Sequence, residues 1–290
     1  MNSPKVSVLM TAFNREDYIK DAIESVLASS YSNLELIIVD DGSTDATVSI
    51  IDKYTSADSR VKLYINEKNL GDYPNRNRAA SYATGKYLKY IDSDDYIYPW
   101  GLELLIKMME ENPGAGWGLC SFEQDDENPY PFLLTPSEAY KYHYGERGIF
   151  IKAPLSSIIT RECFEKLGGF RPIRMAGDFD MWHRLAKHFP VLLMPQGIVW
   201  SRVHFAQESS DSGKTIGLYE ELKIEHLSSE DCPLERKLRI KFIKSQRNRL
   251  IKAGIKNLLL FKISKAILHI KSLMPYYSVS YNKLGRFGNL

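Results

Sequence analysis

The sequence predicts an α/β fold in which a mostly parallel central sheet is flanked by helices and followed by basic, amphipathic C-terminal helices. Three observations support this prediction. Strand and helix patterns alternate over the first hundred residues, the alternation loosens after Asp95, and the charge changes sign near residue 234. Residues 234–290 hold 14 Lys and Arg and one acidic residue, a net charge of +13, against −11 for residues 1–233. A split of this size indicates two regions with different partners.

Length and composition exclude several classes of protein. The 290 residues suffice for one large domain, alone or with an appendage. A hydrophobic content of 44% and a charged content of 26% exclude a disordered or collagen-like chain. Three cysteines are too few for a disulfide scaffold or a Cys-based zinc site. The N-terminus lacks a signal-peptide pattern, and the longest apolar run is far short of the ~20 residues that span a bilayer. We therefore expect a cytoplasmic protein.

The first hundred residues predict the parallel half of the sheet. The apolar runs at 5–12, 34–40, 61–65 and 87–91 are expected to be buried strands. Helices are expected at 17–29, 46–54 and 74–84. Ser43 or Thr44 is placed to cap the second helix, and Pro74 and Gly85 to begin and end the third. Such alternation forms parallel sheets through right-handed crossovers.

The pattern beyond Asp95 is less regular. Helices are expected at 99–111, 161–167 and 177–189, and strands at 116–122, 155–160, 191–194 and 198–203. The acidic, Pro-containing stretch 124–136 is expected to be an exposed loop. Residues 234–273 are expected to be helical, with a break at Ala253-Gly254.

Polar side chains follow the first two predicted strands. Ligands of parallel sheets bind outside the carboxyl ends of the strands, so Thr11, Asn14 and Arg15 lie where a nucleotide would bind. The alternative is an ordinary connection capped by Asn14 or Asp17. Asp41, in the DDGSTD motif at 40–45, is placed to accept a hydrogen bond from a base imide or a ribose hydroxyl. The alternative there is a turn that uses Asp and Gly for backbone reasons.

Three carboxylates, Asp92, Asp94 and Asp95, follow the fourth predicted strand. They form a set of hard oxygen ligands suited to Mg²⁺ or Mn²⁺. Such an ion would bridge the two phosphates of a nucleotide. The alternative is a helix N-terminus enriched in acids, but the next predicted helix begins only at Pro99.

These motifs, in this order and spacing, resemble the family 2 inverting glycosyltransferases of the GT-A fold. The resemblance rests on VSVLMTAFNRE (6–16), VDDGSTD (39–45), residues 69–95 and GDFDMWHRL (177–185), and it covers roughly residues 4–205. It implies transfer of a sugar, with inversion, from a nucleotide-diphosphate donor, most simply a UDP-sugar. It also implies a divalent metal, Mn²⁺ or Mg²⁺, and a saccharide or lipid-linked saccharide acceptor in surface polysaccharide synthesis.

The resemblance implies roles for individual residues in donor binding. It places Thr11 near the base and ribose, and Arg15 near the base or phosphates. Asp41 matches the acid that reads the base imide, most often that of uracil. Arg76 matches an arginine near the diphosphate and the acidic motif.

The resemblance also implies a metal site and a general base. Asp94 matches a position near the ribose and the ion, and Asp95 matches a ligand of that ion. His204, after the last core strand, matches a further metal ligand. The alternative for His204 is a structural histidine. Asp178 matches the base that takes the acceptor's proton, with Asp180 as the fallback. The family often has Glu before that base, whereas this chain has Gly177.

The resemblance further divides the chain. We expect residues 1–213 to form the catalytic domain, with a nucleotide-sugar half at about 1–95 and an acceptor half at about 96–213, and residues 214–290 a basic helical extension. The polar stretch 207–213 would suit a lid over the donor. The acceptor half contains an aromatic-rich set suited to stacking on sugars or to ordinary core packing: Trp117, Tyr130, Phe132, Tyr140, Tyr142, His143 and Tyr144.

The basic C-terminal region allows three interpretations. Its apolar and basic residues favour an anionic membrane surface, which would place the enzyme at the inner face of the membrane. The alternatives are packing on the catalytic domain or self-association, and nucleic-acid binding, which we do not expect.

The sequence also leaves two other functions of the whole protein open. The protein could be a nucleotidyltransferase, or it could bind a sugar nucleotide without catalysing a reaction.

Overall fold

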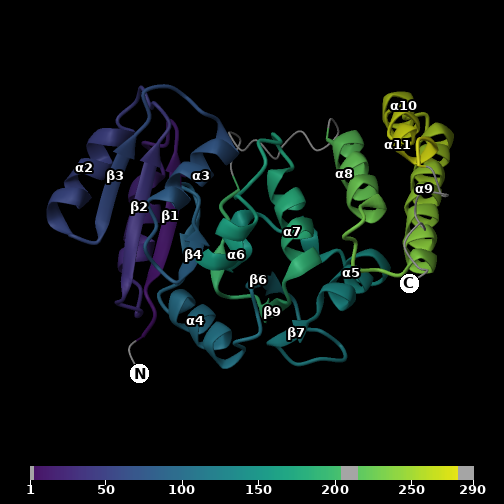
Figure 1. Cartoon of the computed structure of the whole chain (residues 1–290). Coiled ribbons are helices and arrows are strands. Elements are labelled where there is room, and N and C mark those ends of the chain that lie inside the picture. The colour runs from purple at the N-terminus through teal and green to yellow at the C-terminus, as the bar shows by residue number, and fades with distance from the viewer. Residues whose placement is uncertain (1–2, 204–214, 280–290) are drawn as a thin grey trace.

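The computed structural model describes residues 3–203 and 215–279, and its centre is a mixed sheet in the strand order β3-β2-β1-β4-β8-β6-β9-β7 (Figure 1). The first four strands run parallel, as predicted: β1 (Val6–Ala12), β2 (Leu34–Asp40), β3 (Val61–Ile65) and β4 (Tyr87–Tyr90). β8 (Ser157–Thr160) is antiparallel to both β4 and β6 (Trp117–Phe122). β9 (Val191–Pro195) is parallel to β6, and β7 (Phe132–Leu134) is antiparallel to β9 at the edge.

Helices cover both faces of the sheet, because the parallel strands are apolar on both sides. Val6, Val8 and Met10 of β1 belong to the hydrophobic cluster that contains α1 (Ile19–Leu27), α2 (Thr47–Ala57) and α4 (Gly101–Glu111). Leu9 belongs to the cluster of the opposite face. The alternation of side chains along β1 thus assigns successive residues to the two layers.

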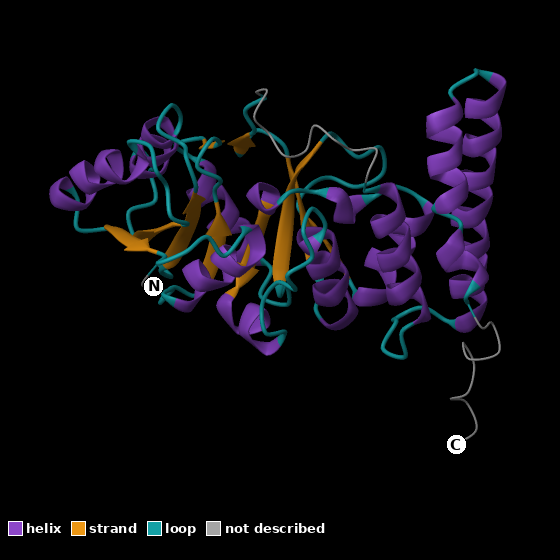
Figure 2. Cartoon of the chain, turned by 90° about the horizontal axis from the view of Figure 1, so that it is seen from above, coloured by secondary structure: helices purple, strands orange, loops and turns teal. Residues whose placement is uncertain are grey.

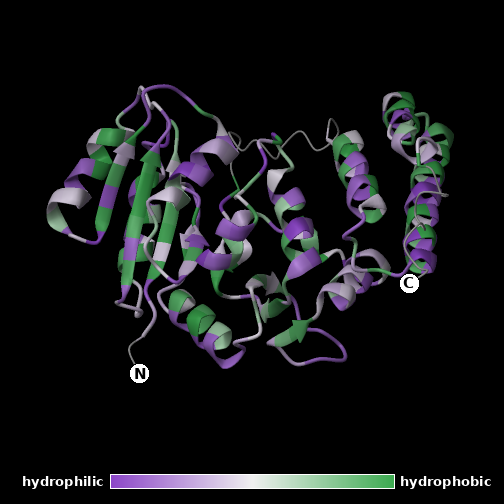
Figure 3. Ribbon diagram, viewed as in Figure 1, coloured by the Kyte–Doolittle hydropathy of each residue, from purple (hydrophilic) through white to green (hydrophobic). Residues whose placement is uncertain are grey.

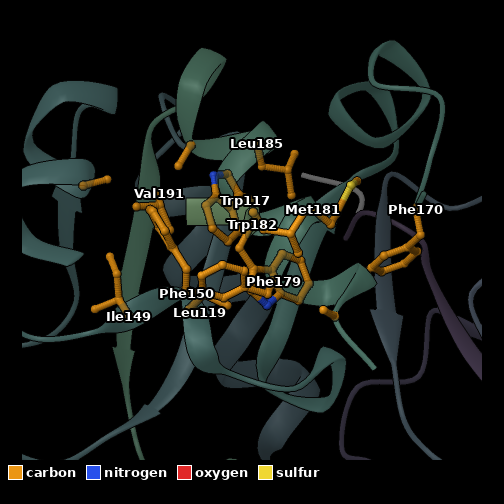
Figure 4. Close-up of a cluster of buried hydrophobic side chains, with 14 of the residues drawn as sticks. Trp117, Leu119, Ile149, Phe150, Phe170, Phe179, Met181, Trp182, Leu185 and Val191 are labelled. Atoms are coloured by element: carbon orange, nitrogen blue, oxygen red, sulfur yellow. The ribbon is translucent and has the colours of Figure 1, made fainter. Parts of the chain in front are cut away.

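The second layer holds most of the large aromatic side chains. It is built from α3 (Asp72–Ser81), α5 (Pro136–Gly145), α6 (Arg161–Lys166) and α7 (Gly177–His188). The buried rings of Trp117 and Trp182 stack 5.5 Å apart, between β6 and α7 (Figure 4). Aromatic side chains of this size dominate the packing energy of a core, so α7 is firmly held against the sheet.

A short two-stranded sheet lies beside the main sheet in the part of the chain before residue 204. β5 (Tyr96–Ile97) pairs in antiparallel fashion with β10 (Val199–Trp200). This pairing brings the end of the acidic motif at 92–95 close to residues 201–203. The two 3₁₀ turns, Ile149–Ile151 and Pro154–Ser156, lie between α5 and β8.

The C-terminal region consists of α8 (Ile216–Ser228), α9 (Arg236–Leu259), α10 (Ile263–Lys271) and α11 (Met274–Tyr277). Figure 2 shows α9 and α10 side by side at the end of the molecule opposite the N-terminus. Leu227 of α8 and Phe242 and Ile243 of α9 are buried in the same cluster as α7. The first part of this region is therefore continuous with the hydrophobic core around α7. None of the helices in the described ranges is long and apolar enough to cross a membrane.

Several local predictions were wrong. The stretch 124–136 contains β7, and α5 follows it, started by a capping box between Thr135 and Glu138. Neither Ser43 nor Thr44 caps α2: the Asp45 carboxylate accepts the Thr47 N–H instead. α9 continues through Ala253-Gly254, because Gly254 is a buried contact site for α10 rather than a helix end. The chain turns later, at residues 260–262.

Candidate active site

The loops that follow β1 and β2 are joined to each other at the carboxyl ends of the strands. The Asn14 N–H donates to Ser43 Oγ over 2.8 Å, and the Thr44 N–H donates to Asn14 Oδ1 over 2.9 Å. The buried carboxylate of Asp40 accepts the N–H groups of Gly42 and Ser43. Figure 3 shows hydrophobic strands here ending in hydrophilic loops. These bonds hold the strand ends rigidly where Thr11 and Asp41 lie.

Asp41 is 4% exposed and accepts three hydrogen bonds from the segment before α3. Its Oδ1 accepts from Asn66 Nδ2 over 2.7 Å and from the Leu70 N–H over 2.8 Å, and its Oδ2 accepts from the Gly71 N–H over 2.9 Å. Thr11 is half-buried and lies opposite Val39 in the β1–β2 register. Asp41 thus also fixes the segment 66–71, a role that its sequence motif does not reveal.

Arg15 and Asp94 face each other across the strand ends. The Arg15 Nε lies 3.3 Å from Asp94 Oδ2, and both side chains remain partly exposed. The Arg15 N–H also donates to Thr47 Oγ1 over 2.7 Å. Two residues that the sequence assigns to the donor site are therefore brought into contact with each other.

Arg76 lies between two carboxylates on the inner face of α3. Its Nε donates to Asp72 Oδ1, and its second terminal nitrogen lies by Asp92 Oδ1, both over 2.7 Å. Burial alone would lower the pKa of Arg76, but Asp92 and Asp72 raise it well above its usual value. Burial raises the pKa of Asp92, against the effect of Arg76. Arg76 is therefore a fixed positive charge next to the acidic motif.

Asp95 is the least exposed of the three acids in the motif, at 5% exposure. Burial and the negative charge of Asp92 raise its pKa to about 7, although the Arg202 N–H donates to its Oδ1 over 2.9 Å. Such crowding of carboxylates is relieved by a cation. Asp94 and Asp95 therefore fit a divalent ion that takes its remaining ligands from water or phosphate.

The chain itself does not supply a complete metal site in the part that the structure describes. No group of three or more His, Cys, Asp and Glu side chains converges there. His204 and the stretch 207–213 lie outside the described residues.

Arg202 lies beside the acidic motif. Its guanidinium contacts Asp21 over 3.1 Å and lies over the rings of Tyr18 and Tyr96.

Asp178 opens α7 and faces α3. Its Oδ1 accepts from the Tyr73 hydroxyl over 3.1 Å and from the Phe179 N–H over 2.7 Å. Burial raises the pKa of Asp178 to about 6, and those two bonds and the charge of Arg76 oppose this rise. A half-buried carboxylate with this pKa is unprotonated at neutral pH and able to accept a proton.

Asp180 lies in a different environment from Asp178. It is fully buried, 3.1 Å from His226 Nε2 on α8 and 3.4 Å from a terminal nitrogen of Arg171. Arg184 approaches its other oxygen to 3.6 Å. These contacts bind α7 to its neighbours, so the geometry gives Asp180 a structural role.

Tyr73 is the site residue that sequence reasoning missed. It is 5% exposed, and its ring lies against the backbone of Gly177, where an added Cβ would come within 2.7 Å of the ring. Tyr73 and Arg76 are three residues apart on α3, so they share one face of the helix. The only sequence signal was Gly177 itself, at the position where the family often has Glu.

Five members of the aromatic set that the sequence suggested for stacking on sugars fall into two groups. Trp117, Tyr140 and Tyr144 are buried in the core, and the Tyr144 hydroxyl lies 2.9 Å from His183 Nε2. Tyr130 and Phe132 are half-buried, with stacked rings 5.2 Å apart near the edge strand β7. Packing therefore accounts for the first group.

Comparison with known sequences identifies a family. The profile of Glycosyl transferase family 2 matches residues 7–168. Over 188 residues the chain is 41% identical to TuaG of Bacillus subtilis, which is named as a teichuronic acid biosynthesis glycosyltransferase; the match covers 63% of this chain and 73% of TuaG. Matches to two uncharacterized glycosyltransferases of Haemophilus influenzae span only 57% and 34% of those proteins.

Solved structures share the fold. A structure of S. aureus TarS in complex with UDP-GlcNAc superposes with a TM-score of 0.67 at 17% identity, covering 94% of this chain and 91% of that one. The mannosyltransferase PcManGT from Pyrobaculum calidifontis, in complex with GDP-Man and Mn²⁺, gives a TM-score of 0.63 at 15% identity, covering 96% and 88%. The fold, the family profile and the sequence relatives agree: this chain belongs to glycosyl transferase family 2.

Proposed function

We propose that this chain transfers a sugar, with inversion, from a nucleoside-diphosphate sugar to a hydroxyl of a saccharide or lipid-linked saccharide, in surface polysaccharide synthesis. The observation that carries the proposal is the pair of helices α3 and α7. These helices carry Asp178, whose carboxyl pKa is raised to about 6, and the buried Arg76, which contacts Asp92 of the acidic motif. Relatives such as TuaG, named for teichuronic acid biosynthesis, and the B. subtilis glycosyltransferase EpsE support the assignment to polysaccharide synthesis.

The donor would bind at the carboxyl ends of β1, β2 and β4. Thr11 and Asp41 would contact the base and ribose, and Arg15 would turn from Asp94 toward a phosphate. The UDP-GlcNAc complex of TarS supports a uridine nucleotide. In the conformation described, Asp41 accepts two hydrogen bonds at Oδ1 and one at Oδ2 from residues 66–71, so Oδ2 would accept the base imide with its remaining lone pair.

A divalent ion, Mn²⁺ or Mg²⁺, would be held by Asp94 and Asp95, with His204 as a further ligand. When bound, it would stabilise the negative charge of the departing nucleoside diphosphate. The PcManGT complex with Mn²⁺ supports such an ion. Arg76 would add a fixed positive charge beside Asp92 on the same side of the site.

Asp178 would accept the proton of the acceptor hydroxyl as that oxygen attacks the anomeric carbon opposite the leaving group. Inversion needs one base on the attacking side, in contrast to the two carboxylates of an inverting hydrolase. The Tyr73 hydroxyl and the Phe179 N–H hold one oxygen of the carboxylate, which leaves the other to receive the proton.

We also propose that the protein is a cytoplasmic enzyme that works at the inner face of the membrane.

Calorimetry and a donor screen test the proposal. Stabilisation of the fold by nucleotide-sugars in the presence of Mn²⁺ should select UDP-sugars, because selective binding raises stability by mass action. Asp178→Asn should retain donor binding and lose transfer to an acceptor. GDP or dTDP binding about tenfold tighter than UDP, a difference of about 1.4 kcal/mol, would contradict the uridine assignment.

A further inference from the structure

The end of the α9–α10 hairpin, residues 252–274, exposes an unusual amount of apolar surface; we name this segment the elbow. Phe261 is 89% exposed, Leu259 75% and Met274 71%. Further apolar side chains in the same segment are about half exposed: Ile255, Leu258, Leu260, Ile263, Ile267 and Ile270. So many exposed apolar side chains in one short segment are rare on soluble monomers and indicate a contact site.

The exposure follows from how the hairpin is packed. Earlier turns of α9 bury Phe242, Ile243 and Leu250 against the body of the molecule. Beyond them Gly254 of α9 lies against His269, Ile270 and the fully buried Ala266 of α10. This contact is narrow, so most of the apolar side chains near the turn remain exposed. Figure 2 shows the turn at one tip of the hairpin, away from the sheet.

The elbow carries several positively charged side chains. Five exposed lysines lie along it: Lys252, Lys256, Lys262, Lys265 and Lys271. Residues 236–290 contain no Asp or Glu. An apolar surface with lysines at its rim is the pattern of a helix that lies in a membrane interface, where the alkyl stems of the lysines reach back to the headgroups.

The charge distribution distinguishes an anionic bilayer from a second copy of the chain. A two-fold contact between elbows would bring the lysines of both copies together, with no acidic side chain in the segment to pair with them. An acidic protein surface would neutralise the lysines but would leave Phe261 and Leu259 without an apolar partner. An anionic bilayer provides both acyl chains and negative headgroups.

We propose that the elbow inserts into an anionic lipid bilayer, with Leu259 and Phe261 in the acyl region and the lysines at the headgroups. The earlier, basic part of α9 then serves chiefly to attach the elbow to the catalytic body. This proposal does not depend on the transfer reaction, since lipid binding is measured without donor or acceptor.

Co-sedimentation of the full chain with vesicles tests the proposal. The wild type should bind vesicles of phosphatidylcholine mixed with phosphatidylglycerol, and should bind pure phosphatidylcholine much less. Leu259→Ser combined with Phe261→Ser should weaken binding at least tenfold, from the apolar area lost. Lys262→Gln combined with Lys265→Gln should weaken it by about fivefold per lysine, on the mixed vesicles only.

A matched control removes exposed apolar residues elsewhere. Leu104→Ser combined with Ile151→Ser should leave vesicle binding unchanged, because both side chains are exposed far from the hairpin in sequence. Unchanged thermal unfolding of all three double variants would show that the fold is kept. Equal binding by the wild type and the Leu259/Phe261 variant would overturn the proposal, as would equal affinity for neutral vesicles. A wild-type dimer that the same variant makes monomeric, without vesicle binding, would assign the elbow to a second copy instead.

Discussion

Asp178→Asn should make the protein more stable while it abolishes transfer. The pKa of Asp178 is raised from 3.8 to about 6, chiefly by burial, so the folded state holds the proton more tightly than the unfolded state. Such a group stabilises the fold below the unfolded pKa, and this contribution is lost as the pH rises through about 6. At about 1.4 kcal/mol for each pKa unit, the cost at neutral pH is at most about 3 kcal/mol, and partial exposure reduces it to about 1 kcal/mol.

Asparagine removes the charge and preserves the contacts. Its Oδ1 can still accept from the Tyr73 hydroxyl and the Phe179 N–H, which both donate to Oδ1 of Asp178. We therefore expect a gain of about 1 kcal/mol in the free energy of unfolding near neutral pH, roughly 2–4 °C in Tm for a chain of this size. Transfer should fall by at least ~10²-fold, the lower end of what a general base contributes.

Urea unfolding at two pH values separates this effect from a general change in packing. The gain should be present at about pH 7.5 and should disappear near pH 4, where the wild-type carboxyl is protonated. Asp180→Asn is the control, because that carboxylate is fully buried and bound to His226 and Arg171, so its loss should destabilise the fold. A variant of Asp178 that is less stable at both pH values, or one that transfers within a few-fold of the wild type, would refute the reasoning.

Four further changes follow from the same contacts. Tyr73→Phe removes a hydrogen bond that favours the charged form of Asp178, so the acidic limb of kcat/KM against pH should move up by roughly one unit; an unmoved limb would remove Tyr73 from the mechanism. Gly177→Ala should lower transfer, since its Cβ would lie 2.7 Å from the Tyr73 ring, and normal activity would show that the ring yields freely. Asp95→Asn should abolish metal-dependent donor binding in calorimetry with Mn²⁺, and unchanged affinity would show that Asp95 is not a ligand. Deleting residues 234–290 should abolish cooperative thermal unfolding, because Phe242 and Ile243 lie in the main core, and a sharp transition would contradict that view.

The strands and helices of the first hundred residues were predictable because their signals are local. β2 is a mostly apolar run that is buried at every position, and its length and neighbours identify it as a parallel strand. The strand ends then follow from topology, and the structure brings Arg15 and Asp94 together there. The prediction of β7 failed because three half-exposed residues in an acidic, Pro-containing stretch carry little pattern of their own.

Contacts between residues distant in sequence were not predictable in the same way. Tyr73 and Asp178 are 105 positions apart, and no local pattern links a tyrosine in one helix to a carboxylate at the start of another. Gly254 gave a misleading local signal, because glycine both ends helices and permits close helix packing. Only the position of α10 shows which of the two uses applies.

The same interhelix contact explains how this chain can lack the Glu that often precedes the base in its family. A Cβ at residue 177 would lie 2.7 Å from the ring of Tyr73, so a side chain there requires the ring to move from its present position. With glycine there, the tyrosine reaches Asp178 and donates a neutral hydrogen bond to it. A second carboxylate at that position would instead raise the pKa of Asp178 by repulsion. Because Tyr73 and Arg76 share one face of α3, the orientation of that helix positions both the hydrogen bond to the proposed base, Asp178, and the fixed charge beside Asp92. If Asp178 is the base of the proposed transfer, the α3–α7 contact, more than any single residue of the acidic motif, sets the pH dependence of that transfer.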